Sequence, residues 1–362
     1  MNSNSRTSPS SLSVCSDTQL QLPSTLGLKQ KLPITDALTR QVQDNRNTIR
    51  AILNGEDERL LVIVGPCSLH HPDSALEYAE KLLALAQSLN DEIFLVMRTY
   101  IEKPRTTVGW KGLAYDPWLN GSNDVHAGLE IARILLRDIV AKGLPIANEV
   151  LHPIAAGYFD DLMSWAAVGA RTTESQVHRE LVSGLGIPVG FKNGTDGGVA
   201  IACDAMRAAA HQHTHFGVNS QGVAAVIKTD GNPDTHLVLR GGIAGPNYDR
   251  FSVATAKTAM DKAALPSRIL VDCSHSNSGK SHTRQPGVFA NVLEQRLDGE
   301  HSLKGMMLES HLYEGCQVLG KSLRYGVSVT DACLGWDATE ASLTHAALTL
   351  AKAKPRMKVI AV

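Results

Sequence analysis

The sequence predicts an α/β chain folded as a (β/α)8 TIM barrel, with an N-terminal helical extension and an inserted β-hairpin. Eight short apolar runs alternate with segments of helical periodicity, as expected for a parallel sheet whose strands are buried on both faces. The runs end at Cys67, Arg98, Glu149, Arg171, Lys192, Arg240, His275 and Glu309. An open, doubly wound sheet is the alternative, because periodicity alone does not assign short apolar runs.

The chain before the first strand forms the predicted extension, residues 1–55, and residues 56–362 form the predicted catalytic barrel. Up to about residue 30 the chain is rich in Ser and Asn and is expected to be a mobile tail. Residues 33–55 carry apolar side chains near helical spacing and predict one amphipathic helix. Residues of about 214–235 alternate around Ser-Gln-Gly and predict the inserted hairpin.

Composition restricts the class of protein. The 362 residues carry a formal net charge of −1, which argues against a general nucleic-acid binder, because such proteins need a basic excess. The six cysteines show no framework spacing, and we expect a reducing compartment. The N-terminus lacks the apolar core of a signal peptide, and no apolar run approaches the roughly 20 residues of a membrane span. The expected location is therefore the cytoplasm.

Cationic side chains end four of the predicted strands, at Arg98, Arg171, Lys192 and Arg240. In a barrel these ends meet at one face, where active sites are built. Four converging positive charges predict a small substrate with several negative charges, and the arginine fork suits carboxylate or phosphate. A second basic cluster follows the second strand and predicts a separate phosphate site, formed by Lys103, Pro104, Arg105 and Thr106.

Donor side chains occupy the remaining strand ends and predict a divalent metal site. They are Cys67, His275 and Glu309, with Asp331 just beyond the eighth strand. One sulfur, one nitrogen and two carboxylates suit Mn, Fe, Co, Zn or Cu and do not choose among them. Taken singly, Cys67 is typical of a buried small side chain and His275 of a core histidine, so the assignment depends on their joint placement.

Together these motifs resemble a known family, the short microbial type of 3-deoxy-D-arabino-heptulosonate 7-phosphate (DAHP) synthase, the first enzyme of the shikimate pathway. The resemblance runs from about residue 35 to about 352. It is carried, in order, by GPCS at 65–68, MRTYIEKPRTTVGWKG at 97–112, GARTTESQVHRE at 169–180, PVGFKNGTDG at 188–197, LRGG at 239–242, DCSHSNS at 272–278, ESHLYEG at 309–315 and SVTDACLGW at 328–336.

The resemblance implies a transferase that condenses phosphoenolpyruvate with erythrose 4-phosphate and releases phosphate. It places phosphoenolpyruvate on Arg98, Ala170, Arg171, Lys192 and Arg240, with Glu149 close by, and erythrose 4-phosphate on Lys103, Pro104, Arg105 and Thr106. It implies the same metal ligands, Cys67, His275, Glu309 and Asp331. The expected catalytic residues are Lys192, Glu149, Cys67 and His275. A lysine among arginines should have a lowered pKa, which would suit Lys192 as a proton donor or charge stabiliser.

The extension and the hairpin resemble the regulatory elements of this family. They imply feedback inhibition by an aromatic amino acid and a homodimer or homotetramer. The inhibitor is expected near Leu181, Leu185, Gly186 and Phe216. Gly186 stands where phenylalanine-sensitive members tend to have Ser, which favours tyrosine.

One departure and two alternatives stay open. The family's GGK-x-PNY becomes GGIAGPNY at 241–248, with one extra residue and no lysine, so affinity for phosphoenolpyruvate is expected to differ from the family norm. A related synthase that uses another aldose phosphate, such as arabinose 5-phosphate, is disfavoured by KPRTT at 103–107. A catalytically silent, ligand-binding barrel is disfavoured by the intact donor and cation sets.

Overall fold

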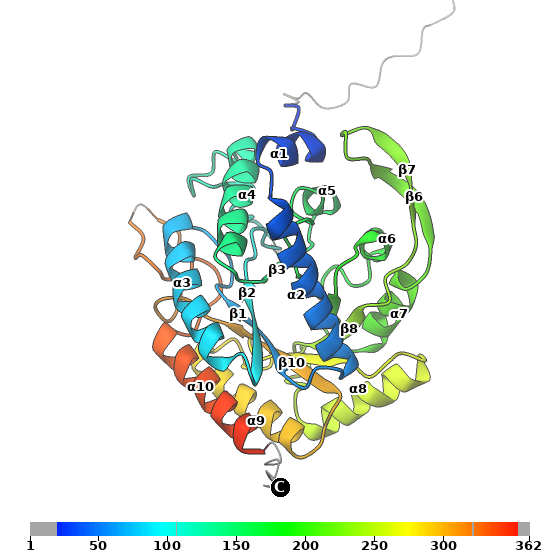
Figure 1. Cartoon of the computed structure of the whole chain (residues 1–362), viewed down its shortest axis with the longest axis vertical. Helices are drawn as coiled ribbons and strands as arrows, with labels where there is room; N and C mark the ends of the chain where they lie inside the picture. Colours follow the sequence, from blue (N-terminus) through cyan, green and yellow to red (C-terminus); the bar gives the residue numbers. More distant parts are fainter. Residues whose placement is uncertain (1–19, 106, 321, 354–362) are drawn as a thin grey trace, which may run out of the picture.

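Eight parallel strands close into a barrel in the computed structural model, which describes residues 20–105, 107–320 and 322–353 (Figure 1). The order around the barrel is β1-β10-β9-β8-β5-β4-β3-β2. The strands are β1 (Leu60–Gly65), β2 (Ile93–Arg98), β3 (Ile146–Glu149), β4 (Trp165–Val168), β5 (Val189–Lys192), β8 (Thr235–Leu239), β9 (Ile269–Asp272) and β10 (Leu303–Glu309). All eight apolar runs form these strands, and the predicted barrel is confirmed.

Strand β1 closes the barrel, because it pairs with both β2 and β10. Leu61 stands opposite Phe94 on one side and Gly305 on the other. Successive residues of β1 point to opposite faces, so Leu61 and Ile63 enter the inner core while Val62 and Val64 pack under the surrounding helices. Burial on both faces explains why the strands read as continuous apolar runs.

Helices surround the barrel and connect its strands. They are α3 (Pro72–Leu89), α4 (Val125–Ala141), α5 (Pro153–Ala156), α6 (Gln176–Gly184), α7 (Ala200–Ala209), α8 (Arg250–Lys262), α9 (Gln285–Leu297) and α10 (Trp336–Ala353). A 3-10 turn at His282–Arg284 precedes α9. Among the helices described, none combines the length and apolarity needed to cross a lipid bilayer.

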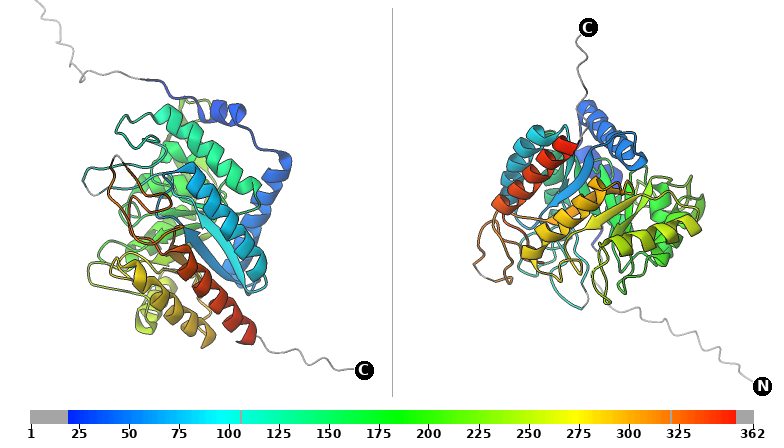
Figure 2. Two further views of the ribbon diagram at one scale, coloured as in Figure 1. Left: turned by 90° about the vertical axis from the view of Figure 1, so that its left-hand side faces the viewer. Right: turned by 90° about the horizontal axis from the view of Figure 1, so that it is seen from below.

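Helix α2 (Asp36–Asn54) lies across one end of the barrel (Figures 1 and 2). The Thr35 hydroxyl caps its first turn, and Gly55 ends it in the left-handed conformation with φ +81°. Its Ile49, Ile52 and Leu53 belong to the inner core of the barrel. The helix predicted over residues 33–55 is therefore present, and it fills the end of the barrel opposite the long loops.

The expected mobile tail up to about residue 30 is wrong in its last part. Residues Thr25–Lys31 form α1, capped by the Ser24 hydroxyl, which accepts from the Gly27 N–H at 3.0 Å. The Leu26 N–H donates to the Ser220 carbonyl at the hairpin tip, at 2.9 Å. Tertiary contacts thus order a helix too short to be stable alone. Residues 1–19 lie outside the described part.

The inserted hairpin is confirmed, as β6 (His213–Val218) and β7 (Ala224–Thr229). Phe216 pairs with Val226, and the chain turns between Asn219 and Val223. The hairpin ends earlier than predicted: residues 230–234 form the connection to β8, which begins at Thr235. In Figure 1 it curves outside the barrel beside α6 and α7.

Candidate active site

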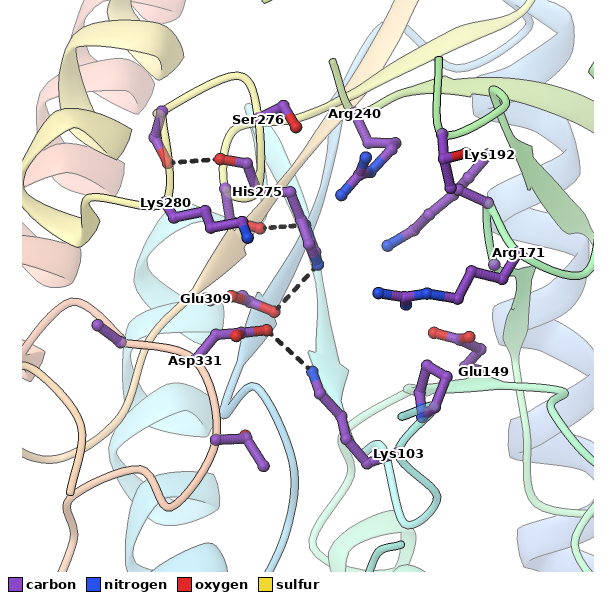
Figure 3. Close-up of a pocket in the computed structure, with 18 of the residues that line it drawn as sticks. Lys103, Glu149, Arg171, Lys192, Arg240, His275, Ser276, Lys280, Glu309 and Asp331 are labelled. Carbon is purple, nitrogen blue, oxygen red and sulfur yellow. Dashed lines mark hydrogen bonds and ion pairs between the residues drawn. The ribbon is translucent and has the colours of Figure 1, made fainter. Parts of the chain in front are cut away.

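A cavity of about 760 Å³, here the central cavity, opens where the barrel strands end (Figure 3). The predicted residues that line it are Arg98, Lys103, Pro104, Arg105, Glu149, Ala170, Arg171, Lys192, Arg240, His275, Glu309 and Asp331. Cys67 is buried behind this wall and contacts Asp331. Thr106 lies outside the described residues. The parallel barrel brings these side chains together because each follows the carboxyl end of a strand.

Three of the four predicted metal ligands form one compact group. The donor atoms of Cys67, Glu309 and Asp331 all lie within 4.8 Å of one another. His275 stands at its edge, with Nε2 3.9 Å from Oε1 of Glu309 (Figure 3). A sulfur, an imidazole nitrogen and two carboxylates on this scale fit a first-row divalent ion.

The Cys67 thiol is held in its neutral form in this environment. Burial, followed by the nearby Glu309 carboxylate, raises the pKa of the thiol to about 12. The thiol donates to Oδ2 of Asp331 at 3.4 Å. A bound cation would favour the thiolate, so Cys67 has the chemistry of a buried metal ligand more than that of an exposed nucleophile.

His275 takes an unusual backbone conformation, with φ +52°. The Lys280 N–H donates to its carbonyl at 2.7 Å, which fixes the turn. Its Nδ1 lies 2.9 Å from Oδ2 of Asp272 and 2.7 Å from the Ser274 hydroxyl. These partners orient the ring so that Nε2 faces Glu309. Left-handed backbone in a residue other than glycine is uncommon and concentrates at functional sites.

Asp272 also contacts Lys192, and this contact overturns the expected pKa of the lysine. Lys192 Nζ lies 3.0 Å from Oδ2 of Asp272, with both side chains buried. Burial lowers the pKa of Lys192, but the Asp272 carboxylate together with Tyr100 and Glu149 outweighs it, and the net direction is upward. The expected lowering was wrong because the counter-charge comes from another strand, β9.

Arg98 connects the cation set to the donor set. Its buried guanidinium lies 3.0 Å from Oε1 of Glu309 and donates to the carbonyls of Pro66 and Cys67 at 3.1 and 3.2 Å. The guanidinium carbon lies 3.6 Å from the centre of the Tyr100 ring. Arg98 therefore fixes the position of Glu309 and of the loop that carries Cys67.

Glu149, Arg171 and Arg240 face the same space from the other wall of the central cavity (Figure 3). The Glu149 carboxylate packs against Gly169, where an added Cβ would come within 2.4 Å of Oε1. The Arg240 N–H donates to Oδ1 of Asn193 at 2.8 Å, which anchors the end of β8. These contacts set a carboxylate among cations on the wall of the central cavity.

Side chains of the loop predicted to bind a sugar phosphate point in two different directions. Lys103 is buried, with Nζ 2.7 Å from Sγ of Cys67 and 3.2 Å from Oδ2 of Asp331. Its ammonium holds the pKa of the Asp331 carboxyl below the usual range. Arg105 donates to the Trp110 carbonyl at 2.7 Å and, with Pro104, lines the central cavity.

The predicted inhibitor residues are only partly brought together. Leu185 and Gly186 line a second, smaller cavity of about 180 Å³, with Lys29, Arg46, Asp160, Asp161, Gly184 and Ile187. Leu181 is half-buried on α6, and Phe216 is 96% exposed on β6; neither lines this second cavity. An amino acid needs a cation for its carboxylate and an anion for its ammonium. Arg46 and Asp160 place both charges on this wall, with Asp160 also paired with Lys29.

Several residues in and around the central cavity were not predicted from the sequence. Asp272 lies in the motif DCSHSNS, from which His275 alone was predicted as a site residue, and a polar residue at the end of an apolar strand was the available signal. Gln285 exchanges two hydrogen bonds with the Glu309 backbone, at 2.9 and 3.0 Å. The Glu102 carboxylate accepts hydrogen bonds from the Tyr115 hydroxyl at 3.2 Å and from the His152 N–H at 3.5 Å. Burial raises the pKa of Glu102 to about 7. The loop at 241–248, which departs from the family pattern, places Ile243 at the central cavity.

Fold and site define a class: a (β/α)8 barrel whose strand ends gather cations for an anionic substrate beside donors for a divalent ion. The family model of the DAHP synthetase I family matches residues 33–344. The chain belongs to the DAHP synthetase I family, and the resemblance seen in the sequence is confirmed.

Similar proteins agree in name. The chain is 52% identical over 319 residues to the Tyr-sensitive phospho-2-dehydro-3-deoxyheptonate aldolase of Escherichia coli K12, covering 87% of this chain and 89% of that one. It is 51% identical over 324 residues to the Phe-sensitive protein of the same strain, covering 89% and 92%. The structure of phospho-2-dehydro-3-deoxyheptonate aldolase from Francisella tularensis SCHU S4 superposes with a TM-score of 0.92 at 40% identity, covering 94% of this chain and 100% of that one.

Proposed function

We propose that this chain condenses phosphoenolpyruvate with D-erythrose 4-phosphate in a metal-dependent reaction and forms DAHP and phosphate. The aldehyde carbon of the sugar bonds to carbon 3 of phosphoenolpyruvate, water adds to carbon 2, and phosphate leaves with cleavage of the C–O bond. The observation that carries the proposal is the convergence of Arg171, Lys192 and Arg240 on the space beside the donor group of Cys67, Glu309 and Asp331.

The cations hold phosphoenolpyruvate in this scheme. Arg98, Arg171, Lys192 and Arg240, with the Ala170 backbone, balance its carboxylate and phosphate charges. Lys192 stays protonated because Asp272 stabilises its charge, so it donates hydrogen bonds to the substrate. Glu149, at the end of β3 and against Gly169, orients the water that adds to carbon 2.

Cys67, His275, Glu309 and Asp331 would hold the divalent ion. When bound, the ion supplies a Lewis acid for the aldehyde group of the sugar. Lys103, Pro104, Arg105 and Thr106 would bind the sugar phosphate. The native ion is proposed to be Mn, Fe, Co or Zn, each of which suits the mixed donor set.

The decisive experiment measures phosphoenolpyruvate loss and phosphate release with erythrose 4-phosphate, on enzyme stripped by a chelator and then resupplied with Mn²⁺. We expect activity to disappear and return. Activity that survives complete stripping would contradict the metal dependence alone. Turnover with arabinose 5-phosphate and none with erythrose 4-phosphate would contradict the sugar assignment.

We also propose feedback inhibition by tyrosine in a homodimeric or homotetrameric protein. Support comes from Leu185 and Gly186 on the wall of the second cavity, which offers opposite charges for an amino acid. The relatives are named as Tyr-sensitive and Phe-sensitive. Tyrosine is preferred over phenylalanine as the proposed inhibitor because residue 186 is Gly and not Ser. Inhibition by phenylalanine at equal or lower concentration, in a side-by-side titration, would contradict the choice of tyrosine.

A further inference from the structure

We propose that Lys103 is an internal cation of the metal site, which an incoming ion displaces toward the sugar-phosphate pocket. Metal binding and sugar-phosphate binding would then be coupled through the two positions of one side chain. This inference rests on the proposed metal and sugar-phosphate sites and adds a linkage between them.

Lys103 and an incoming ion compete for the same donor atoms. The ammonium donates to Sγ of Cys67 at 2.7 Å and to Oδ2 of Asp331 at 3.2 Å, and these two atoms lie 3.4 Å apart. At bond lengths of about 2.0–2.3 Å to both atoms, an ion on either side of them lies within about 4 Å of Nζ. A divalent cation and an ammonium that close repel strongly inside a protein.

Before an ion arrives, two cationic side chains balance the charge of the donor group. Arg98 pairs with Glu309 at 3.0 Å, and Lys103 pairs with Asp331 at 3.2 Å. The two cations thus neutralise the two carboxylates of the donor group and hold it together. These ion pairs hold the donor group in an arrangement ready for an ion. The Lys103 ammonium then competes with that ion for the donor atoms.

The Lys103 ammonium can leave the donor group while the backbone of its loop stays in place. The Lys103 N–H donates to the Lys111 carbonyl at 2.8 Å, which anchors the backbone, and Pro104 follows directly. The flexible four-carbon stem can rotate while the backbone stays fixed. Lys103, Pro104 and Arg105 all border the central cavity, so the displaced ammonium enters the space beside Arg105. A phosphate bound there stabilises the outward position of the Lys103 ammonium, which ion binding also requires.

These two preferences make the coupling reciprocal. An ion excludes the inward position, and a sugar phosphate draws the ammonium outward, so each ligand raises the affinity for the other by the same factor. Replacing Lys103 by an uncharged side chain removes the competitor of the ion. A lysine that merely supported the fold would behave oppositely, and its loss would weaken ion binding.

The test measures Mn²⁺ affinity, from the paramagnetic resonance signal of the free ion, with and without glycerol 3-phosphate as a stable sugar-phosphate probe. Saturating phosphoenolpyruvate is present throughout. The variants are Lys103→Met and, as a matched control, Lys111→Met, which makes the same change at an exposed position of the same loop. We expect Lys103→Met to bind Mn²⁺ at least fivefold more tightly than the natural chain and to be insensitive to the probe.

The natural chain and Lys111→Met should gain at least threefold in Mn²⁺ affinity when the probe is added. Equal or weaker binding of Mn²⁺ by Lys103→Met, with normal binding by the natural chain, would overturn this inference and spare the proposed function. No binding of Mn²⁺ by the natural chain would remove the proposed metal site together with the inference.

A second measurement needs no variant and so does not depend on how Lys103→Met folds. Reductive methylation followed by peptide mass spectrometry reports the rate at which each lysine reacts. We expect Mn²⁺ to raise the rate at Lys103 at least threefold and to leave Lys111 unchanged. An unchanged or slower rate at Lys103 on saturation with Mn²⁺ would overturn the displacement.

Discussion

Oδ2 of Asp272 lies 2.9 Å from Nδ1 of His275, and the same oxygen lies 3.0 Å from Nζ of Lys192. One buried carboxylate therefore joins the histidine proposed to bind the metal to the lysine proposed to bind phosphoenolpyruvate. Ser274 donates to the other oxygen of Asp272 through its hydroxyl at 2.6 Å and its N–H at 3.0 Å, which holds the carboxylate in place. Asp272 is thus a positioning residue for both parts of the site.

Replacing this carboxylate should damage both parts at once. We predict that Asp272→Asn lowers kcat/KM by at least about 100-fold, since it leaves Lys192 buried without a counter-charge. It should also weaken Mn²⁺ binding by about 10- to 100-fold, the usual effect of losing the partner of a ligating histidine. Steady-state kinetics and Mn²⁺ titration measure the two losses. Asp298→Asn, at an exposed ion pair, is the control. A change in kinetics with unaltered Mn²⁺ binding would separate the two roles.

The proposed ligand Cys67 offers a direct test of the metal site. We predict that Cys67→Ala loses metal-dependent turnover and at least about 100-fold in metal affinity, because the donor group loses its thiolate. Absorption of the Co²⁺-loaded protein should lose its sulfur-to-metal band. Cys203→Ala, in α7, should keep that band. Full turnover of Cys67→Ala at stoichiometric metal would exclude Cys67 as a required ligand.

The contact between Gly169 and Glu149 predicts an effect on catalysis. An added Cβ at residue 169 would lie 2.4 Å from Oε1 of Glu149, so Gly169→Ala must displace the carboxylate. We predict at least about a tenfold fall in kcat, in line with the loss of a positioned acid-base group. Gly287→Ala, in α9 with nothing within 4 Å of the new Cβ, is the matched control. It should stabilise the protein by up to about 1 kcal/mol and keep kcat. A normal kcat for Gly169→Ala would remove the water-orienting role of Glu149.

His236 predicts how stability depends on pH. It is buried inside the barrel, where its Nε2 accepts from Trp165 at 3.0 Å, and burial lowers its pKa from 6.5 to about 3. The unfolded chain therefore binds one more proton between these two values, so the free energy of unfolding falls as pH drops below 6.5. At pH 5.5 this one group costs about 1.4 kcal/mol relative to its neutral form.

Denaturant titrations at pH 7.5 and 5.5 measure this loss of stability. His236→Gln keeps an acceptor for Trp165 and should reduce the loss by about 1.4 kcal/mol. His301→Gln, at an exposed position, should leave the pH dependence unchanged. An equal loss in His236→Gln and the natural chain would mean that His236 does not titrate on unfolding.

Gly186 predicts the choice of inhibitor. A Cβ added there meets nothing within 4 Å, so a serine fits without displacing a neighbour. We predict that Gly186→Ser shifts the preference from tyrosine toward phenylalanine by several-fold, because the hydroxyl changes the polarity of the wall that an aromatic ring meets. Inhibition curves for both amino acids measure the ratio, and Gly186→Ala separates the added bulk from the hydroxyl. An unchanged ratio in Gly186→Ser would place the inhibitor away from this wall.

The strands and most of the cavity wall could be predicted because burial and position coincide in this fold. A strand buried on both faces must be apolar, and a charged residue such as Arg98 at its end must face the cavity. The features that the sequence did not reveal depend on pairs of residues that are far apart along the chain. Helix α1 needs the carbonyl of Ser220, and the charge of Lys192 needs Asp272 from β9. Neither partner is near in sequence, so no local pattern reports it.

Helix α2 gives the N-terminal extension an architectural role. Ile49, Ile52 and Leu53 share the inner core with residues of the barrel strands, so the floor of the barrel comes from a segment outside the eight repeating units. Removing residues 1–55 to abolish the proposed inhibition would uncover that core and invite aggregation. A truncation aimed at the proposed inhibitor site should therefore end before α2, so that it removes Lys29 of α1 from the second cavity and keeps α2 as part of the barrel.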